Sequence, residues 1–302
     1  MTRRTRLLGA AFVVFAAALM VGGCRPEPIE RVEWPAMGTI AAAQARGPGA
    51  RNQAYWIRGL NQPAFFLVEL LLNAHDPKSE LSRLAPCADA DVLARCANDM
   101  CPCYEAAFAL KGASDGAFNP RWRGTNTLDL GAIAKGFAVD RMDSMLRSCR
   151  PARTDCLIDL GGNVKSLRGV WKTGVKDPNG DGFAAVVDLR EGEALATSAT
   201  YYRGGHIYDG RTGAPVSNDV ASVTVLCRSA MWADGLSTTL FILGPDEGRD
   251  FLARKRQGLL GDEPVAALWI LKDGRHVSAD GEGRFQKKNP VTCKEGGSAK
   301  TP

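Results

Sequence analysis

The sequence predicts an α+β fold, built as a single intertwined unit of mixed β-sheets flanked by helices. Stretches with apolar residues at helical spacing alternate with short β-rich runs, and no internal repeat is present. No shift in composition marks a linker after Pro35. The 302 residues, 45% of them hydrophobic and 24% charged, supply a sizeable core and exclude disorder, collagen and coiled coil.

Each element follows from local periodicity. Apolar residues at helical spacing predict helices over 64–73, between 89 and 111, and over 133–146. Short β-rich runs then predict strands over 156–160, 171–175, 184–189 and 220–227. A helix over 229–243 and a strand over 266–271 complete the pattern.

The N-terminus has the layout of an export signal. Arg3, Arg4 and Arg6 precede an uncharged run over 7–21, and small residues lead to Cys24. This end resembles a bacterial lipobox, in which Cys24 becomes the lipidated first residue of the mature chain; a plain signal peptide with a structural thiol at Cys24 is the alternative. We therefore expect a signal peptide over 1–23, a Pro-rich tether over 24–35, one domain over 36–290 and a polar tail over 291–302.

The charge balance gives no reason to expect nucleic acid as a partner. Lys and Arg number 38 against 33 Asp and Glu. Three of the basic residues lie in the first 23, where no acid occurs, which leaves 35 against 33 in the remainder.

Nine cysteines agree with export, because eight remain beside Cys24 and disulfides persist in oxidising compartments. Four fall within 17 residues, at 87, 96, 101 and 103. Their spacing lacks a paired C-x-x-C and no histidine is near, so disulfides are favoured over zinc. Cys149 and Cys156 bracket a Pro-containing loop and are candidates for a local bridge.

Neither a P-loop nor a dinucleotide-binding glycine motif is present, and four weaker local signals remain. Residues 128–140 predict a strand, a glycine turn and a helix with Lys135 in its first turn; backbone N–H groups there attract phosphate. Asp234 and Thr238 lie four apart on one face of an apolar helix, an oxygen pair suited to Mg²⁺. A solvated Lys135, and a Thr238 bonded back to its own helix, are the alternatives.

The third signal is a polar segment over 197–209. It combines hydroxyls, including Thr197 and Ser198, with Arg203, His206 and Asp209. Arginine suits phosphate and histidine suits proton transfer, although a β-hairpin with a packed histidine is the plainer interpretation. A further stretch over 177–188 has the oxygen pattern of a calcium loop, but its β-rich flanks favour a hairpin turn.

Eight motifs in this order resemble one family, the FAD:protein FMN transferases, or ApbE family. The resemblance covers about residues 36–245. Its motifs lie at Met37-Gly38-Thr39, 79–84, Ser114-Asp115-Gly116-Ala117-Phe118, 128–140, Asp159-Leu160-Gly161-Gly162-Asn163, 196–198, 206–215 and Ala233-Asp234.

The resemblance implies an exported, lipid-anchored enzyme facing the periplasm, with an ApbE-like fold. It would cleave FAD, attach FMN to a Thr or Ser hydroxyl of an exported redox protein, and release AMP. The ligands of Mg²⁺ would be Asp234, Thr238 and the backbone carbonyl of Ala132. His206 would be the base, with Asp209 in reserve. The implied FAD site contains Met37, Ser114, Asp115, Gly116, Lys135, Thr197 and Ser198.

This chain departs from the family pattern at several positions. The stretch between Phe118 and Leu128 is short, and Trp122 is the candidate substitute for a missing aromatic. His75 stands where a tyrosine is usual, Asn119 where an aspartate is, and Gly210 where a proline is. Ala199 likewise replaces a usual glycine. An FAD pyrophosphatase and a non-catalytic FAD-binding lipoprotein therefore remain as alternatives.

Overall fold

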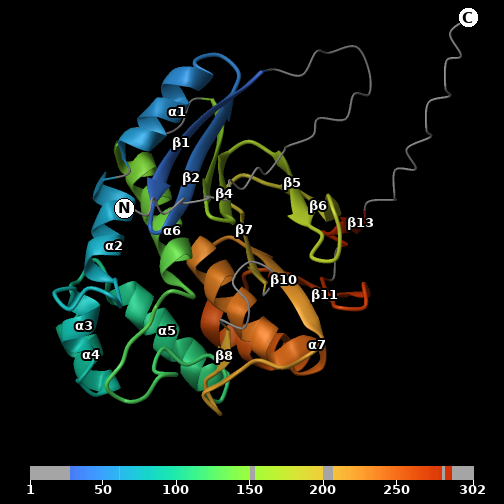
Figure 1. Cartoon of the computed structure of the whole chain (residues 1–302). Helices are drawn as coiled ribbons and strands as arrows, with labels where there is room; N and C mark the ends of the chain where they lie inside the picture. Colours follow the sequence, from blue (N-terminus) through green and yellow to red (C-terminus); the bar gives the residue numbers. More distant parts are fainter. Residues whose placement is uncertain (1–27, 61, 150–153, 200–206, 281–282, 288–302) are drawn as a thin grey trace, which may run out of the picture.

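The computed structural model describes residues 28–60, 62–149, 154–199, 207–280 and 283–287. The predicted signal peptide, Cys24 and the polar tail lie outside these residues. Within them, no helix is both long and apolar enough to cross a membrane. Figure 1 shows the helices α1 to α4 along one side of the molecule and the sheets along the other.

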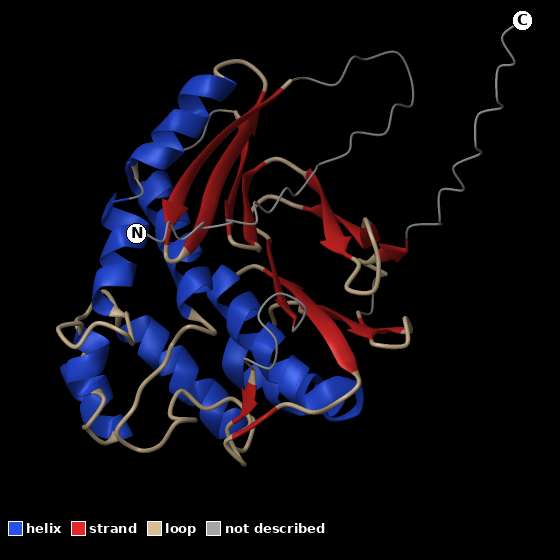
Figure 2. Ribbon diagram, viewed as in Figure 1, coloured by secondary structure: helices blue, strands red, loops and turns tan. Residues whose placement is uncertain are grey.

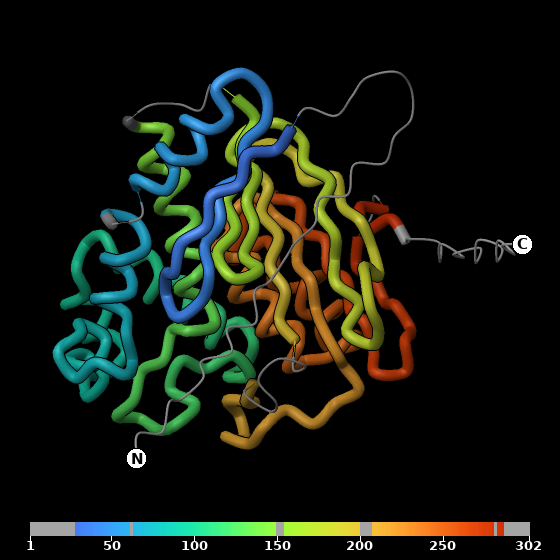
Figure 3. Tube along the Cα trace, turned by 45° about the horizontal axis from the view of Figure 1, so that its top comes forward, coloured from blue at the N-terminus to red at the C-terminus, as the bar shows by residue number. Residues whose placement is uncertain are grey.

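An eight-stranded sheet is the centre of the fold. Its strand order is β1-β2-β3-β4-β7-β10-β11-β12, so neighbours in the sheet follow chain order, as the colours in Figure 3 show. The described strand pairs are antiparallel throughout. The strands are β1 (Ile29–Ala36), β2 (Thr39–Arg46), β3 (Asp155–Leu160), β4 (Asn163–Arg168), β7 (Ala194–Ala199), β10 (Val220–Cys227), β11 (Ala266–Leu271) and β12 (His276–Ala279).

Helices cover one face of this sheet (Figure 2). The longest are α6 and α7, which pack on each other and on the sheet, while α1 packs on β1 and β2. The helices are α1 (Ala50–Gly59), the π-helix η1 (Gln62–Phe66), α2 (Leu67–Leu71), α3 (Glu80–Leu84), α4 (Asp89–Arg95), α5 (Cys101–Ala113), α6 (Ala134–Cys149) and α7 (Ala230–Leu260).

A small three-stranded sheet covers the other face. It consists of β5 (Trp171–Lys176), β6 (Phe183–Leu189) and β13 (Gln286–Lys287), and a two-stranded pair of β8 (Tyr208–Asp209) and β9 (Ala214–Pro215) lies apart. Along β3 the alternation of a strand divides the side chains: Ile158 joins the core under the helices, whereas Leu157 joins a second core with Trp171. The sheet is therefore buried on both sides at this point.

The prediction of a Pro-rich tether over 24–35 is wrong for most of that stretch, because it overlaps the first strand. Residues 29–35 belong to β1, which pairs with β2 along its whole length. Pro35 concealed this strand in the sequence, but proline is tolerated in an edge strand. Met37 and Gly38 make the two-residue turn, with φ of 48° and 68°.

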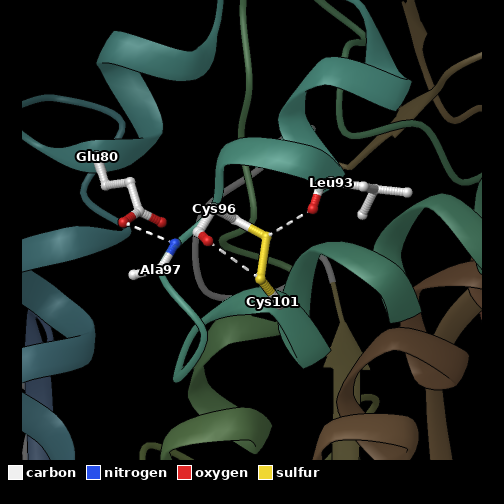
Figure 4. The surroundings of a disulfide bond; sticks show 5 residues. All are labelled: Glu80, Leu93, Cys96, Ala97 and Cys101. Atoms are coloured by element: carbon white, nitrogen blue, oxygen red, sulfur yellow. Dashed lines mark hydrogen bonds between the residues drawn. A yellow bond between two sulfur atoms is a disulfide. The ribbon is translucent and has the colours of Figure 1, made fainter.

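The helix predicted between 89 and 111 is two helices. α4 ends at Arg95 and α5 begins at Cys101, with Pro102 in its first turn, where proline is well placed. A disulfide joins Cys96 to Cys101 across the break (Figure 4). The zinc alternative is thereby removed, since two of the four clustered cysteines are bonded to each other.

The predicted Cys149–Cys156 bridge is wrong. Cys156 is a free thiol within β3, fully buried, and burial raises its pKa to about 12. The side chain of Cys149 lies outside the described part of the chain. Loop spacing alone suggested the bridge and did not show that Cys156 faces the core.

Two other predicted features agree with the structure. Ser229 caps the predicted helix, and non-helical backbone at Gly244, with φ of 74°, precedes Pro245; the helix predicted over 229–243 is therefore the first half of α7. Residues 177–182 form the turn of the β5–β6 hairpin, where the Asp177 carboxylate accepts from the Asn179 N–H. Asp188 lies within β6, away from the turn.

Candidate active site

A cleft of about 870 Å³ opens at one end of the large sheet. Two hairpin turns form one wall, around Met37 and around Gly161 and Gly162, and the first turn of α6 and the first half of α7 form another. Residues 68–75 and 118–123, the end of β7 and the start of β8 also line the cleft. Segments more than 100 residues apart in the chain therefore meet here.

Asp234 is the buried carboxylate of this cleft. Its side chain is on α7, 5% exposed, and its Oδ2 accepts a hydrogen bond of 3.0 Å from the backbone N–H of Gly136. Burial raises the pKa of Asp234, although Lys135, whose Nζ is 3.7 Å from Oδ1, and the amide of Asn163 oppose that rise. A carboxylate so placed favours a cation beside it.

Three hydroxyls lie together beside Asp234. Ser198 Oγ, at the end of β7, is 3.0 Å from Thr238 Oγ1 and 2.8 Å from Ser237 Oγ. Ser198 and Thr238 line the cleft, while Ser237 is buried and donates to the backbone carbonyl of Asp234. Thr197 also lines the cleft and shares a hydrogen bond with Thr224 of β10.

The turn before α6 and the first turn of that helix place two more predicted site residues at the cleft, one for the phosphates and one for the metal. Ala132 and Lys135 both line the cleft. Lys135 Nζ lies 3.4 Å from the carbonyl oxygen of Gly131, whose own N–H donates to Asp129. The structure thus brings Ala132 and Lys135 to the same cleft as Asp234 and Thr238, about 100 residues further along the chain.

One buried oxygen at the cleft has no partner in the described part of the chain. Asn163 follows the β3–β4 turn, is almost fully buried, and its Oδ1 accepts no hydrogen bond. Because an unpaired buried acceptor costs about 1–3 kcal/mol, its presence in a cleft lining indicates a ligand donor or cation. The side-chain amide of Asn163 forms its hydrogen bond with the carboxylate of Asp234.

The remaining predicted FAD residues divide into two groups. Met37 lines the cleft and its N–H donates to Glu69 Oε2 over 3.1 Å. Ser114, Asp115 and Gly116 do not line it. Ser114 is buried, donates to the carbonyl of Leu110 and accepts from the N–H of Phe118, so it shapes the loop that carries Phe118 to the cleft.

Of the two proposed bases, His206 and Asp209, the structure describes only Asp209. His206 lies outside the described residues, and Ile207, next in the chain, lines the cleft. Asp209 is in β8, where hydrogen bonds from Arg211 lower the pKa of its carboxyl group. An aspartate held in this way is a weaker proton acceptor than a free one.

Three of the residues that depart from the family pattern, Asn119, Trp122 and Gly210, are neighbours in space. Trp122 stacks on Tyr208 with ring centroids 4.0 Å apart, and the Arg123 guanidinium lies 4.5 Å from the Trp122 centroid. Since Tyr208 covers one face, Arg123 must cover the other, which leaves no free face of Trp122 for a flavin. The N–H of Gly210 donates to the carbonyl of Ala117, which proline could not do. A Cβ on residue 210 would lie 2.2 Å from Asn119 Cβ, so this position requires glycine.

Glu69 and Tyr208 are among the lining residues that sequence reasoning missed. Glu69 resembles any solvated helix glutamate, and nothing in the sequence shows that it meets the Met37 turn. Tyr208 was visible only as part of the polar segment. Within the described residues, no group of three or more His, Cys, Asp or Glu side chains could hold a metal.

Solved structures show that this architecture is the fold of the flavin transferases. The flavin transferase ApbE from Vibrio cholerae superimposes with a TM-score of 0.62 at 22% identity, over 83% of this chain and 98% of that one. The ApbE protein of Thermotoga maritima does so with a TM-score of 0.67 at 21% identity, over 86% and 100%. The predicted α+β class is confirmed.

The sequence comparisons agree on the family. Residues 121–260 match the ApbE family model. An FAD:protein FMN transferase of Klebsiella pneumoniae is 37% identical over 155 residues, and one of Treponema pallidum is 36% identical over 171. These segments cover 48% and 49% of this chain, and 46% and 44% of the relatives, so the chain spans about half the length of the curated relatives it matches. The predicted resemblance to the ApbE family is thereby confirmed.

Proposed function

We propose that the protein is a Mg²⁺-dependent enzyme that transfers FMN from FAD to a Thr or Ser hydroxyl of an exported redox protein and releases AMP. The observation that carries the proposal is the cleft that unites Ala132, Lys135, Asp234 and Thr238 beside a buried unpaired acceptor. The names of the curated relatives support the same reaction.

The oxygen donors fit Mg²⁺. Asp234 offers the one carboxylate, Thr238 a hydroxyl and Ala132 a backbone carbonyl, and hard cations of this size take few protein ligands of these types. When bound, Mg²⁺ neutralises charge on the pyrophosphate and favours departure of AMP.

Side chains of the protein bind the phosphates and accept the proton. Lys135 provides a positive charge for the phosphates at the first turn of α6. The bond that breaks joins the bridging oxygen to the FMN phosphorus, and the bond that forms joins the acceptor oxygen to it. His206 takes the proton of the acceptor hydroxyl, and AMP leaves with the bridging oxygen.

We further propose that Cys24 carries a lipid that anchors the enzyme to a bacterial membrane, with the domain in the periplasm. The support is the basic, apolar and small-residue order of the first 24 residues. The mass of the N-terminal peptide from purified protein tests this point alone.

One assay separates the candidate activities. The protein is incubated with FAD, Mg²⁺ and a redox protein from the same envelope, and the intact mass of that acceptor is measured together with AMP. A gain of FMN on the acceptor with one AMP for each transfer is the expected result. AMP and free FMN without acceptor modification would establish a pyrophosphatase, and bound FAD without turnover would establish a carrier.

A further inference from the structure

The exposed face of α1 is unusual in composition. Arg51, Tyr55, Trp56 and Arg58 point to solvent, with Tyr55 50% and Trp56 37% exposed, while Ala50, Ala54 and Ile57 are buried on the sheet. The helix contains no acidic residue, and the Arg51 guanidinium lies 6.0 Å from the Tyr55 ring. Amphipathic rings beside arginines are typical of helices that lie in a membrane interface.

The position of α1 in the fold also favours contact with a membrane surface. Ile29 pairs with Arg46 at the outer end of the β1–β2 hairpin, and α1 begins four residues after Arg46. Arg46 also donates to the carbonyl of Val170, so this end of the molecule carries two further exposed apolar side chains, Ile29 (37%) and Val170 (51%). Figure 1 shows α1 beside the start of β1.

Chain length fixes how far this end can be from a lipid on Cys24. Ile29 is the fifth residue after Cys24, and five fully extended residues span at most about 18 Å. α1 itself is about 15 Å long. A domain anchored at Cys24 therefore holds α1 within reach of the bilayer surface, at little further entropic cost.

We infer that the exposed face of α1 docks on an anionic phospholipid surface, with Trp56 and Tyr55 at the headgroup level and Arg51 and Arg58 against lipid phosphates. The inference rests on the lipid anchor proposed above and goes beyond the proposed reaction. Docking through α1 fixes the orientation of the anchored domain, because a tether alone leaves the domain free to rotate.

Tryptophan fluorescence tests the docking. The structure describes all six tryptophans, and Trp56 is the one with an exposed side chain. The full chain, purified from membranes in detergent, is reconstituted in phosphatidylcholine–phosphatidylglycerol vesicles with brominated acyl chains. We expect the lipid to quench the parent and to lose most of that quenching with Trp56→Phe. Equal quenching of both proteins would overturn the inference.

A charge-matched pair tests the arginines. Arg51→Glu/Arg58→Glu is compared with Arg254→Glu/Lys255→Glu, which changes the same charge on the exposed face of α7 far from α1. Each basic residue near an anionic surface contributes about 1 kcal/mol, so the α1 pair should lower the docked-to-free ratio by about 25-fold or more at low salt. Equal quenching of Trp56 in the two variants would contradict docking through α1.

Other occupants give different outcomes. If α1 is a homodimer interface, sedimentation without vesicles will show a dimer in the parent that Trp56→Ser dissociates, and the inference is then wrong. If α1 binds the acceptor, Trp56→Ser will raise the acceptor KM in detergent, which also overturns it. Failure of the proposed reaction is distinguishable, because the transfer assay in detergent needs no vesicle and α1 does not line the cleft.

Discussion

The backbone N–H of Gly136 donates to the carboxylate of Asp234, and this bond joins the first turn of α6 to the first turns of α7. The helices approach so closely here that a Cβ on residue 136 would lie 2.1 Å from the carbonyl oxygen of Ala230 and 2.8 Å from Asp234 Cβ. The bond therefore fixes the carboxylate at the cleft and requires glycine opposite it.

Gly136→Ala should destabilise the protein by at least about 1–3 kcal/mol, because overpacking forces the two helix backbones apart. Gly112→Ala in α5 is the matched control: its Cβ would meet nothing within 4 Å, and helix propensity should stabilise the protein by up to about 1 kcal/mol. Urea unfolding measures both. Equal stability of Gly136→Ala and the parent would contradict the close approach.

Asp234→Asn should fold normally, since an amide oxygen still accepts from Gly136, but should lose Mg²⁺ binding and on the order of 10³-fold or more in transfer rate. Thr238→Ala should act in the same direction more weakly, because water replaces a neutral ligand. Ser237→Ala, which removes a neighbouring hydroxyl that does not line the cleft, is its control. Calorimetric titration of Mg²⁺ and the transfer assay measure these effects; full activity in Asp234→Asn would remove it from the metal site.

His206→Asn should keep FAD affinity and lower acceptor flavinylation by about 10²–10⁴-fold, because the acceptor hydroxyl then lacks its base. Asp209→Asn should have a smaller effect, since Arg211 already occupies that carboxylate. His276→Asn on β12 is the control and should leave the rate unchanged. Transfer at the parent rate by folded His206→Asn would exclude this histidine as the base.

Lys165→Met should cost about 3–5 kcal/mol of stability, because it leaves Asp140 and Asp143 without the ammonium that lies 2.7 and 3.2 Å from them. Burial by itself lowers the pKa of Lys165, but the two carboxylates outweigh it and raise the pKa above the ordinary value near 10.5. The stabilisation is therefore complete below about pH 10 and is lost as the pH rises through the raised pKa.

The parent should accordingly lose more stability in strong alkali than Lys165→Met does. Lys172→Met is the control, because Lys172 is exposed and 4.0 Å from Asp188, and its loss should change stability by at most about 0.5 kcal/mol. Thermal melts between pH 7 and 11 compare the three proteins. Parallel pH profiles for the parent and Lys165→Met would contradict the assignment.

Reduction should lower the stability of the protein by about 2 kcal/mol, since the Cys96–Cys101 bond closes a short loop. Cys96→Ser/Cys101→Ser should reproduce that loss and become insensitive to reductant. Cys87→Ser, at a free and partly exposed thiol, should change little. Calorimetry with and without reductant checks this; a parent indifferent to reductant would show that the bond does not stabilise α4 and α5.

Sequence periodicity predicted the elements whose burial has a simple pattern, including α6, β10 and the first half of α7. It failed for β1, because Pro35 is unusual in a strand and this strand lies at the sheet edge. It also predicted one helix where α4 and α5 are separated by a break that the Cys96–Cys101 disulfide spans. The candidate metal ligands were recognisable because Asp234 is a carboxylate on an apolar helix face. Glu69 was not, since its contact with the Met37 turn depends on tertiary packing that no local pattern encodes.

The strand order of the large sheet also constrains how the chain reaches its native state. β2 and β3 are neighbours, yet residues 47–154, with helices α1 to α6, lie between them. As the chain is synthesised, the β1–β2 hairpin is completed more than 100 residues before β3, and until then the open edge of β2 stays unpaired. We expect the nascent domain to be most vulnerable to proteolysis and aggregation in that interval.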